Sequence, residues 1–533
     1  INHIPPCNHP ESFLTGSTVE AMIDRTKALG LDYFAITDLG YLTSVLKGYM
    51  YGESEKVKVI AGVELFFRDD NCDIIKNTES EQIKYFKIIV HAKDQEAYQK
   101  IVKMCSDTRR KQLTVGGNQY GAFNWADLTE LAKSNITITT SNVECMVSKH
   151  LLVGRADLGL KYYEKLRNIV GADNFYPSII PYKQDKYWST FVKATLGDGK
   201  VVHIPAMDKI ETDQKYLDSK AVELTRRGNK HTLLKAVFIN KIKFKVAEQY
   251  QTIQSAKLVN SFQDLDGGDI QTKANRFIIA LANKYGDQDK LLINNYAYYA
   301  TNEDKVVQDM KLGDEKRIYQ SQYMASTDDI RKYMAEELGW VDHSIDMLVQ
   351  HSHDWAKNFD GFKLKYQYRL PTTDGDPLEL LKKQIAKVGR MKWDNPVYVS
   401  QYENELSLLT ENGVINLIPY FLPIVDIYDY YKDNGFLTGP GRGSAGGFLI
   451  SYLLGITHID PIKYELSSPR FLTMDRVKQG NLPDIDCDLE SRVPLVGKDG
   501  SSGYLFNKYG NKAAQVSTRT LLRIKSAILD ANR

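Results

Sequence analysis

Strict alternation of carboxylate and apolar side chains over residues 483–489 constrains this chain more than any other feature. The run Pro-Asp-Ile-Asp-Cys-Asp-Leu places Asp484, Asp486 and Asp488 at every second position, so a β-strand would carry all three on one face. Neighbours on such a face lie roughly 6.5–7 Å apart at Cα, and Asp484 with Asp486 can then clamp two cations about 3.5–4 Å apart. Oxygen ligands favour magnesium, with manganese as an alternative. A solvated strand face or a calcium site would show the same alternation.

A glycine-rich stretch precedes the aspartates. Residues 439–447 read Gly-Pro-Gly-Arg-Gly-Ser-Ala-Gly-Gly, and the apolar run 448–454 follows. This pattern predicts a turn that leads into a helix. Glycines let the backbone approach a ligand, the first N–H groups of a helix are unpaired, and Arg442 can bind an anion through two hydrogen bonds. The stretch therefore predicts a phosphate-binding site, although many glycine-rich turns are only turns.

Two arginines lie between these segments. Arg470 and Arg476 flank Phe471 and Leu472 just ahead of the carboxylates. Two more cations beside a phosphate site and a metal site favour a nucleoside triphosphate as the ligand.

Four motifs of this region occur in one order with the spacing of a known family. They are Gly-Pro-Gly-Arg-Gly-Ser-Ala (439–445), Leu-Gly-Ile-Thr-His-Ile-Asp-Pro (454–461), Arg-Phe-Leu with Arg-Val (470–477) and Pro-Asp-Ile-Asp-Cys-Asp (483–488). The chain closely resembles the alpha subunit of bacterial DNA polymerase III, the family C replicative polymerases. The resemblance is strongest over 402–533, and its divergence is typical of a phage-encoded member.

The resemblance implies roles for individual residues. Asp484 and Asp486 would be catalytic and would bind two magnesium ions, with manganese as an alternative, while Asp488 would support them. The phosphates of the nucleotide would be held by Gly441, Arg442, Gly443, Ser444, Arg470 and Arg476. Family C palms use a third carboxylate, which the resemblance places beyond the end of this sequence.

Strand and helix alternate in the N-terminal part. A helical pattern over 18–30 is followed by a short strand, 33–37, before Asp38, and a second strand, 57–63, ends at Glu64. Polar side chains at strand ends are typical of an α/β barrel-like layer.

This order resembles the PHP domain that opens family C polymerases. The resemblance implies a metal site, but Leu39, Tyr296 and Tyr298 stand at ligand positions of the family. Leucine and neutral phenols are poor substitutes for imidazole and carboxylate. We therefore expect a structural scaffold without a metal. Residues 183–273 lie outside the resemblance and are interpreted as an insertion.

Composition sets the remaining limits. The 533 residues predict roughly two to four domains. The net charge of +2 leaves nucleic-acid binding to a local patch. The resemblance implies that the thumb, which grips DNA, begins in the region that carries Arg519, Arg523 and Lys525. Five scattered cysteines indicate a reducing compartment. The sequence shows no membrane-spanning run or signal segment, so we expect a cytoplasmic protein.

The sequence thus predicts an α/β fold of three parts: a degenerate PHP-type (β/α) barrel over 1–310, a mixed α+β palm over 311–515, and a truncated thumb over 516–533. The expected reaction is DNA synthesis from dNTPs on primer-template DNA. We expect the missing fingers and thumb to come from further sequence or a second chain, with a sliding clamp as a further candidate partner. We expect no synthesis by this chain alone. A metal-dependent phosphoesterase or a non-catalytic DNA- or partner-binding subunit are the alternatives.

Overall fold

A computed structural model provides the fold. It describes residues 7–10, 17–69, 71, 85–108, 112–115, 118–153, 156–182, 190–196, 201–206, 253–260, 270–307, 322–366, 370–413, 415–479, 482–498, 500 and 502–516.

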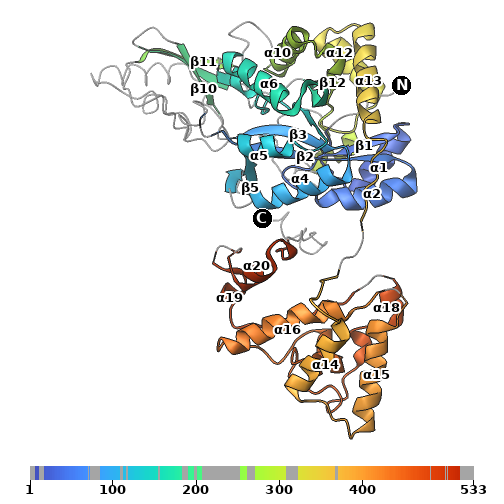
Figure 1. The fold of residues 1–533 in the computed structure, drawn as a ribbon. Coiled ribbons are helices and arrows are strands. Elements are labelled where there is room, and N and C mark those ends of the chain that lie inside the picture. Colours follow the sequence, from blue (N-terminus) through green and yellow to red (C-terminus); the bar gives the residue numbers. More distant parts are fainter. Residues whose placement is uncertain are drawn as a thin grey trace. The chain divides into compact units, whose positions relative to one another are not determined.

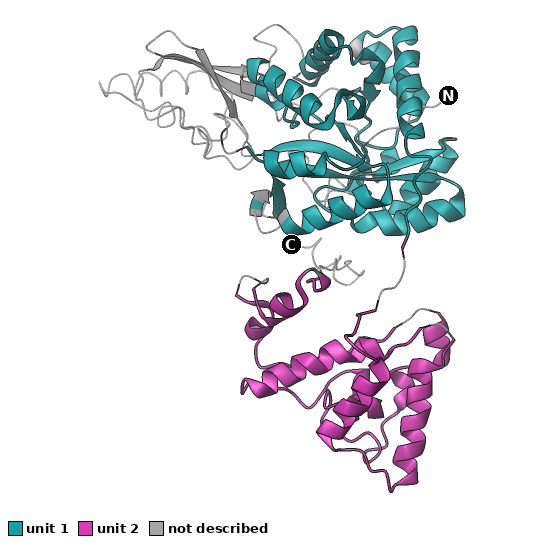
Figure 2. Cartoon of the chain, viewed as in Figure 1, with its two compact units in different colours: residues 1–365 teal, residues 366–533 magenta. Residues whose placement is uncertain are grey.

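The chain forms two compact units, residues 1–365 (unit 1) and 366–533 (unit 2) (Figure 2). Unit 1 ends at residue 365, whereas the division into a barrel and a palm at residue 310 stays a prediction. Helices α12 (Thr327–Leu338) and α13 (Asp342–Lys357) belong to unit 1, because Ile330 and Ile345 are buried in its core. The helical lead-in expected for the second part therefore begins after these two helices.

Unit 1 has mixed α/β structure (Figure 1). In chain order its other elements are α1 (Val19–Ala28), β1 (Tyr33–Ile36), α2 (Thr43–Glu55), β2 (Lys58–Phe67), β3 (Phe86–Ala92), α4 (Gln95–Thr108), β4 (Gln112–Val115), β5 (Asn118–Phe123), α5 (Trp125–Leu131), β6 (Ile136–Thr139), η2 (Lys149–Val153), α6 (Ala156–Val170), η3 (Ala172–Asn174), β7 (Phe175–Tyr176), β8 (Ser178–Ile179), β9 (Thr190–Leu196), β10 (Val201–Ala206), β11 (Ile253–Asn260), α10 (Ile270–Tyr285), η5 (Gln288–Lys290), β12 (Leu292–Ile293) and η6 (Asn302–Asp304).

A seven-stranded sheet is the centre of unit 1. Its order is β4-β5-β2-β3-β6-β7, with β1 paired to β2. β8 follows β7 directly and pairs in parallel with β12. Ala297, just after β12, bridges to Asn8, whose carbonyl accepts from the Thr37 N–H at the end of β1. The chain thus passes from the seven-stranded sheet at β7 to the separate β8–β12 pair, and Asn8 links the segment after β12 to the end of β1.

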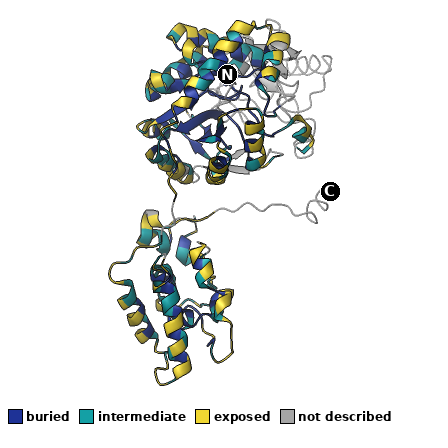
Figure 3. Cartoon of the chain, turned by 90° about the vertical axis from the view of Figure 1, so that its right-hand side faces the viewer, coloured by how far each residue is buried: buried dark blue, intermediate teal, exposed yellow. Residues whose placement is uncertain are grey.

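Helices cover this sheet, whose strands are buried (Figure 3). All seven residues of β3 are buried, as a strand covered on both faces requires. β2 continues to Phe67, so Glu64 lies inside this strand and not at its predicted end. Gly48 allows close packing of α2, because a β-carbon there would lie 2.4 Å from Ile36 Cδ1.

The described strands of the predicted insertion form a separate antiparallel sheet, β10-β9-β11. The first residue of β9, Thr190, pairs with the last residue of β11, Asn260.

Unit 2 is helical in its described residues. Its elements are α14 (Pro377–Val388), α15 (Pro396–Thr410), α16 (Ile418–Asp433), η8 (Ser444–Gly447), α17 (Leu449–Leu453), η9 (Ser468–Arg470), α18 (Met474–Lys478), α19 (Val493–Val496), α20 (Tyr504–Tyr509) and η10 (Gly510–Lys512). Phe448 at the start of α17 contacts the rings of Phe421 and Phe471 in a core separate from that of unit 1. In the part of the chain that the structure describes, no helix is both long and apolar enough to cross a membrane.

Candidate functional site

The aspartate segment of unit 2 follows the predicted alternation but forms no regular strand. Its one described bridge joins Leu489 to Thr438, at the entrance to the glycine-rich loop. A strand needs a neighbour along its length, and here only the loop entrance pairs with it. Ile485 and Cys487 pack against the core, while Asp484 and Asp486 are exposed.

The glycine-rich loop lies directly against the aspartates. A β-carbon at Gly443 would lie 2.6 Å from Asp486 Oδ2, and one at Gly439 would lie 2.5 Å from Asp488 Cβ. Gly443 also has φ +70°, a left-handed conformation that favours glycine. The two segments singled out in the sequence therefore lie in direct contact.

Arg442 is the cation of this site. Its Nε lies 3.8 Å from Asp486 Oδ2, and its Nη1 lies 3.7 Å from Asp488 Oδ1. The three side chains are 41–62% exposed, so solvent screens these contacts. These contacts therefore hold Arg442 in place only weakly.

The start of the helix after the loop differs from expectation. The N–H groups of Leu449 and Ile450, expected to be free for phosphate, donate to the Glu405 carboxylate at 2.9 and 2.8 Å. Glu405 comes from α15 and is buried. A carboxylate at a helix start is stabilised by the helix dipole. The turn at Arg442, Gly443 and Ser444 remains exposed.

Glu405 also connects this helix to the arginine-bearing turn. Its Oε1 accepts a 2.8 Å hydrogen bond from the Ser468 hydroxyl in η9. Burial raises the pKa of Glu405, while hydrogen bonds from Gln401 and the backbone oppose the rise. Sequence reasoning missed this residue, whose signal is a lone acid on the buried face of a helix.

The two predicted arginines of the turn have different surroundings. Arg470 is exposed. Arg476 Nη1 donates to the carbonyls of Arg470 and Phe471 at 3.2 and 2.9 Å. Arg476 therefore stabilises the turn that presents Arg470. The predicted DNA-binding residues Arg519, Arg523 and Lys525 lie outside the described residues.

The donor set suits hard cations. Asp484 and Asp486 are exposed, so their oxygens are accessible from solvent. Such carboxylates bind magnesium or manganese together with substrate phosphates. Burial and the nearby Asp484 raise the pKa of Tyr420, whose hydroxyl donates to the Pro483 carbonyl at 2.8 Å and so anchors the segment.

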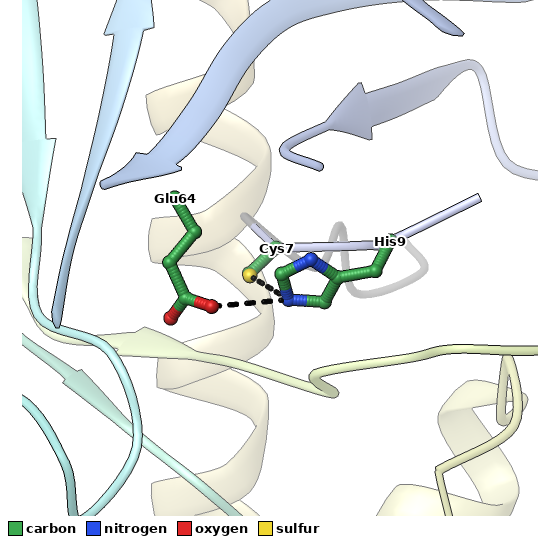
Figure 4. Close-up of side chains that lie close together, drawn as sticks. All are labelled: Cys7, His9 and Glu64. Atoms are coloured by element: carbon green, nitrogen blue, oxygen red, sulfur yellow. Dashed lines mark hydrogen bonds and ion pairs between the residues drawn. The ribbon is translucent and has the colours of Figure 1, made fainter. Parts of the chain in front are cut away.

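A second cluster of polar side chains lies in the centre of unit 1. Cys7 Sγ is 3.3 Å from His9 Nε2, which is 3.5 Å from Glu64 Oε2 (Figure 4). All three residues are buried, and one ligand atom from each lies within 4.8 Å of the others. Sequence reasoning named Glu64 but missed the Cys-x-His pair, whose spacing on an extended segment is the signal that could have revealed it.

The cluster also contains a buried lysine. Lys87 Nζ lies 2.7 Å from Glu144 Oε2 and 3.9 Å from Glu64 Oε2. Although burial lowers it, these carboxylates raise the pKa of Lys87 well above its ordinary value. The ammonium therefore stays charged. Three potential metal ligands are therefore present, and an ammonium group of the protein lies beside one of them, Glu64.

The other residues that the sequence analysis singled out in the barrel make contacts within the protein. The Ser44 hydroxyl donates to Asp38. Tyr296 Oη donates to Glu64 Oε2 at 2.7 Å, and the ring of Tyr298 stacks on His9 at 4.4 Å. Leu39 bridges to Glu64 through the backbone.

Comparisons with known proteins match both units. Residues 378–533 match the bacterial DNA polymerase III alpha NTPase domain, and residues 10–179 match the PHP domain. DNA polymerase III subunit alpha of Helicobacter pylori is 24% identical over 98% of this chain and 38% of its own length. The subunit of Aquifex aeolicus is 29% identical over 52% of this chain and 26% of its own length. The subunit of Ureaplasma parvum is 40% identical over 29% of this chain and 15% of its own length. The chain thus spans less than half the length of these relatives.

Proposed function

Because this chain is a divergent member of the bacterial DNA polymerase III alpha family, we propose that unit 2 carries the nucleotide site of a DNA-directed DNA polymerase. The observation that supports this most is the contact of the glycine-rich loop with the aspartates, with Gly443 packed against Asp486. The substrates would be dNTPs and primer-template DNA. We also propose a PHP-type (β/α) barrel for unit 1 and a palm for unit 2.

The proposed reaction is nucleotidyl transfer. The primer 3′-hydroxyl attacks the α-phosphorus of the dNTP, a new P–O bond forms, and pyrophosphate leaves. Asp484 and Asp486 would hold two magnesium ions, which would lower the pKa of the hydroxyl and neutralise the leaving group. Arg442 would leave its carboxylate partners for the triphosphate, and the exposed Arg470 would add positive charge.

The complete activity would need more protein than this chain. The chain spans 15–38% of the relatives above, so we propose that further sequence or a second chain supplies fingers, thumb and the third carboxylate. A sliding clamp would be a further partner. A phage-encoded protein that acts in the bacterial cytoplasm fits this proposal.

Primer extension tests the proposal. The complete polymerase, with its remaining chain or sequence present, is assayed with magnesium and four dNTPs. Asp484→Ala and Asp486→Ala should each reduce incorporation at least about a hundredfold, as for loss of a preorganised electrostatic group. Asp374→Ala, which removes an exposed acid elsewhere in unit 2, should leave the rate unchanged. A near-normal rate in either site variant would refute the assignment.

A parallel assay uses residues 1–533 alone. We expect no synthesis, because positioning of template and nucleotide supplies much of the rate in this chemistry. Robust synthesis by the isolated chain would show that no second chain is needed.

A further inference from the structure

The polar cluster of unit 1 lies where a PHP-type barrel implies a divalent metal. We propose that the Lys87 ammonium takes the place of that metal, so that unit 1 is held together by a cation of its own chain. The proposal concerns unit 1 alone and goes beyond the polymerase assignment of unit 2.

Lys87 lies inside strand β3, whose residues are all buried. Its ammonium contacts Glu144 at 2.7 Å and approaches Glu64 at 3.9 Å and Tyr296 Oη at 3.5 Å. Unpaired ammonium groups are very costly to bury. The lysine must therefore bridge the two carboxylates, as a divalent ion bridges its acidic ligands.

The oxygens of Glu64 are already hydrogen-bonded. The Ser141 hydroxyl donates to Oε1, and Tyr296 donates to Oε2 at 2.7 Å. A metal at Oε2 would have to displace the phenol and would face the ammonium at close range. Like charges repel strongly inside a protein because the dielectric constant is low.

The thiol and imidazole have partners within the chain too. The Thr37 hydroxyl donates to Cys7 Sγ at 3.1 Å, and His9 packs against Tyr296 and Tyr298. The thiol thus has a hydrogen-bond partner within the chain, whereas a bound metal would require the thiolate.

The charges around the cluster are also nearly balanced. Lys87 acts on the carboxylates of both Glu64 and Glu144, and the buried Lys149 acts on Glu144. Asp38 is a third acid near Cys7. The chain therefore supplies positive charge that a metal would otherwise bring.

Cobalt titration tests the proposal without reference to activity. Cobalt(II) bound by a thiolate gives a charge-transfer absorption band, and metal content can be measured independently after dialysis against zinc. The wild-type chain should show no thiolate–cobalt band, and any zinc that it binds should be retained in Cys7→Ser. One equivalent of either metal, lost in Cys7→Ser, would overturn the proposal.

The variant Lys87→Met/Glu144→Gln removes one positive and one negative charge together, which preserves the balance. It should bind cobalt at least tenfold more tightly than the wild type, with a band that Cys7→Ser abolishes. Wild-type-like absence of binding in this folded variant would show that Lys87 is not what excludes the metal. If the variant does not fold, the wild-type titration still decides.

The result of the cobalt titration does not depend on whether unit 2 is a polymerase site. Asp484 and Asp486 give no thiolate band, and Cys487→Ser controls for the neighbouring thiol. Cobalt bound at Cys7 would leave the polymerase assignment intact.

Discussion

At Gly441 and Gly443 of the glycine-rich loop, the surrounding atoms leave no space for a side chain. A β-carbon at Gly441 would lie 2.8 Å from Thr457 Cγ2, and one at Gly443 would lie 2.6 Å from Asp486 Oδ2. Gly446, three residues further on, has no atom within 4 Å of that position. The loop thus contains both a critical glycine and a matched control.

We expect Gly443→Ala to reduce nucleotide incorporation by about tenfold or more, because small misplacements of reacting groups have large effects on rate. The methyl group would push the Asp486 carboxylate aside, and the left-handed backbone would add strain of about 1 kcal/mol. Gly446→Ala should retain activity. Primer extension by the complete polymerase measures both, and equal activity of the two variants would contradict the proposed role of this contact.

At the scale of elements, α15 organises the site through Glu405. One carboxylate accepts from two N–H groups of α17 and from Ser468 of η9. It thereby fixes the helix that follows the glycine-rich loop relative to the turn that carries Arg470. The short α17 has five residues, too few to be stable alone.

We expect Glu405→Ala to destabilise unit 2 by about 2–4 kcal/mol, because it leaves buried donors unpaired. Glu405→Gln keeps one acceptor oxygen and should cost less. Glu403→Ala, on the exposed side of the same helix, is the control and should have little effect. Chemical denaturation measures all three, and indistinguishable stabilities of the Glu405 and Glu403 variants would refute the role of Glu405.

Local patterns in the sequence predicted part of these elements. Alternation placed Asp484 and Asp486 outward and Cys487 inward, as the structure has them. The capping of α17 could not be predicted, because the residue that caps it lies far earlier in the chain. Lys87 was missed for the same reason: its partner Glu144 comes from a distant segment, although a lysine in an apolar strand is a warning sign.

At the scale of the whole molecule, each unit has its own hydrophobic core. The mixed α/β character was predicted from strand–helix alternation, whereas the boundary was not. The helices α12 and α13 are amphipathic, as are helices of unit 2, so their sequence pattern does not assign them to a unit. Their packing assigns them to unit 1.

We expect two thermal transitions that respond to different substitutions. Gly48→Val, which crowds Ile36 and Val19, should lower the transition of unit 1 alone. Glu405→Ala should lower that of unit 2 by about 2–4 °C per kcal/mol, as for domains of 150–250 residues. Calorimetry of the single and double variants tests this, with additive shifts expected. A single transition lowered by both substitutions would contradict independent cores.

The register of the β9–β11 sheet has a consequence for how this protein varies. Thr190 and Asn260 are paired, so the chain enters and leaves this sheet at neighbouring points. A segment whose two ends are adjacent can lengthen, shorten or be exchanged, because the distance between its attachment points on the rest of the fold does not change. Lineages that carry this fold can therefore differ in length here while the strands on either side, β8 and β12, keep their pairing. The same geometry makes it a natural place to graft a label or a foreign domain.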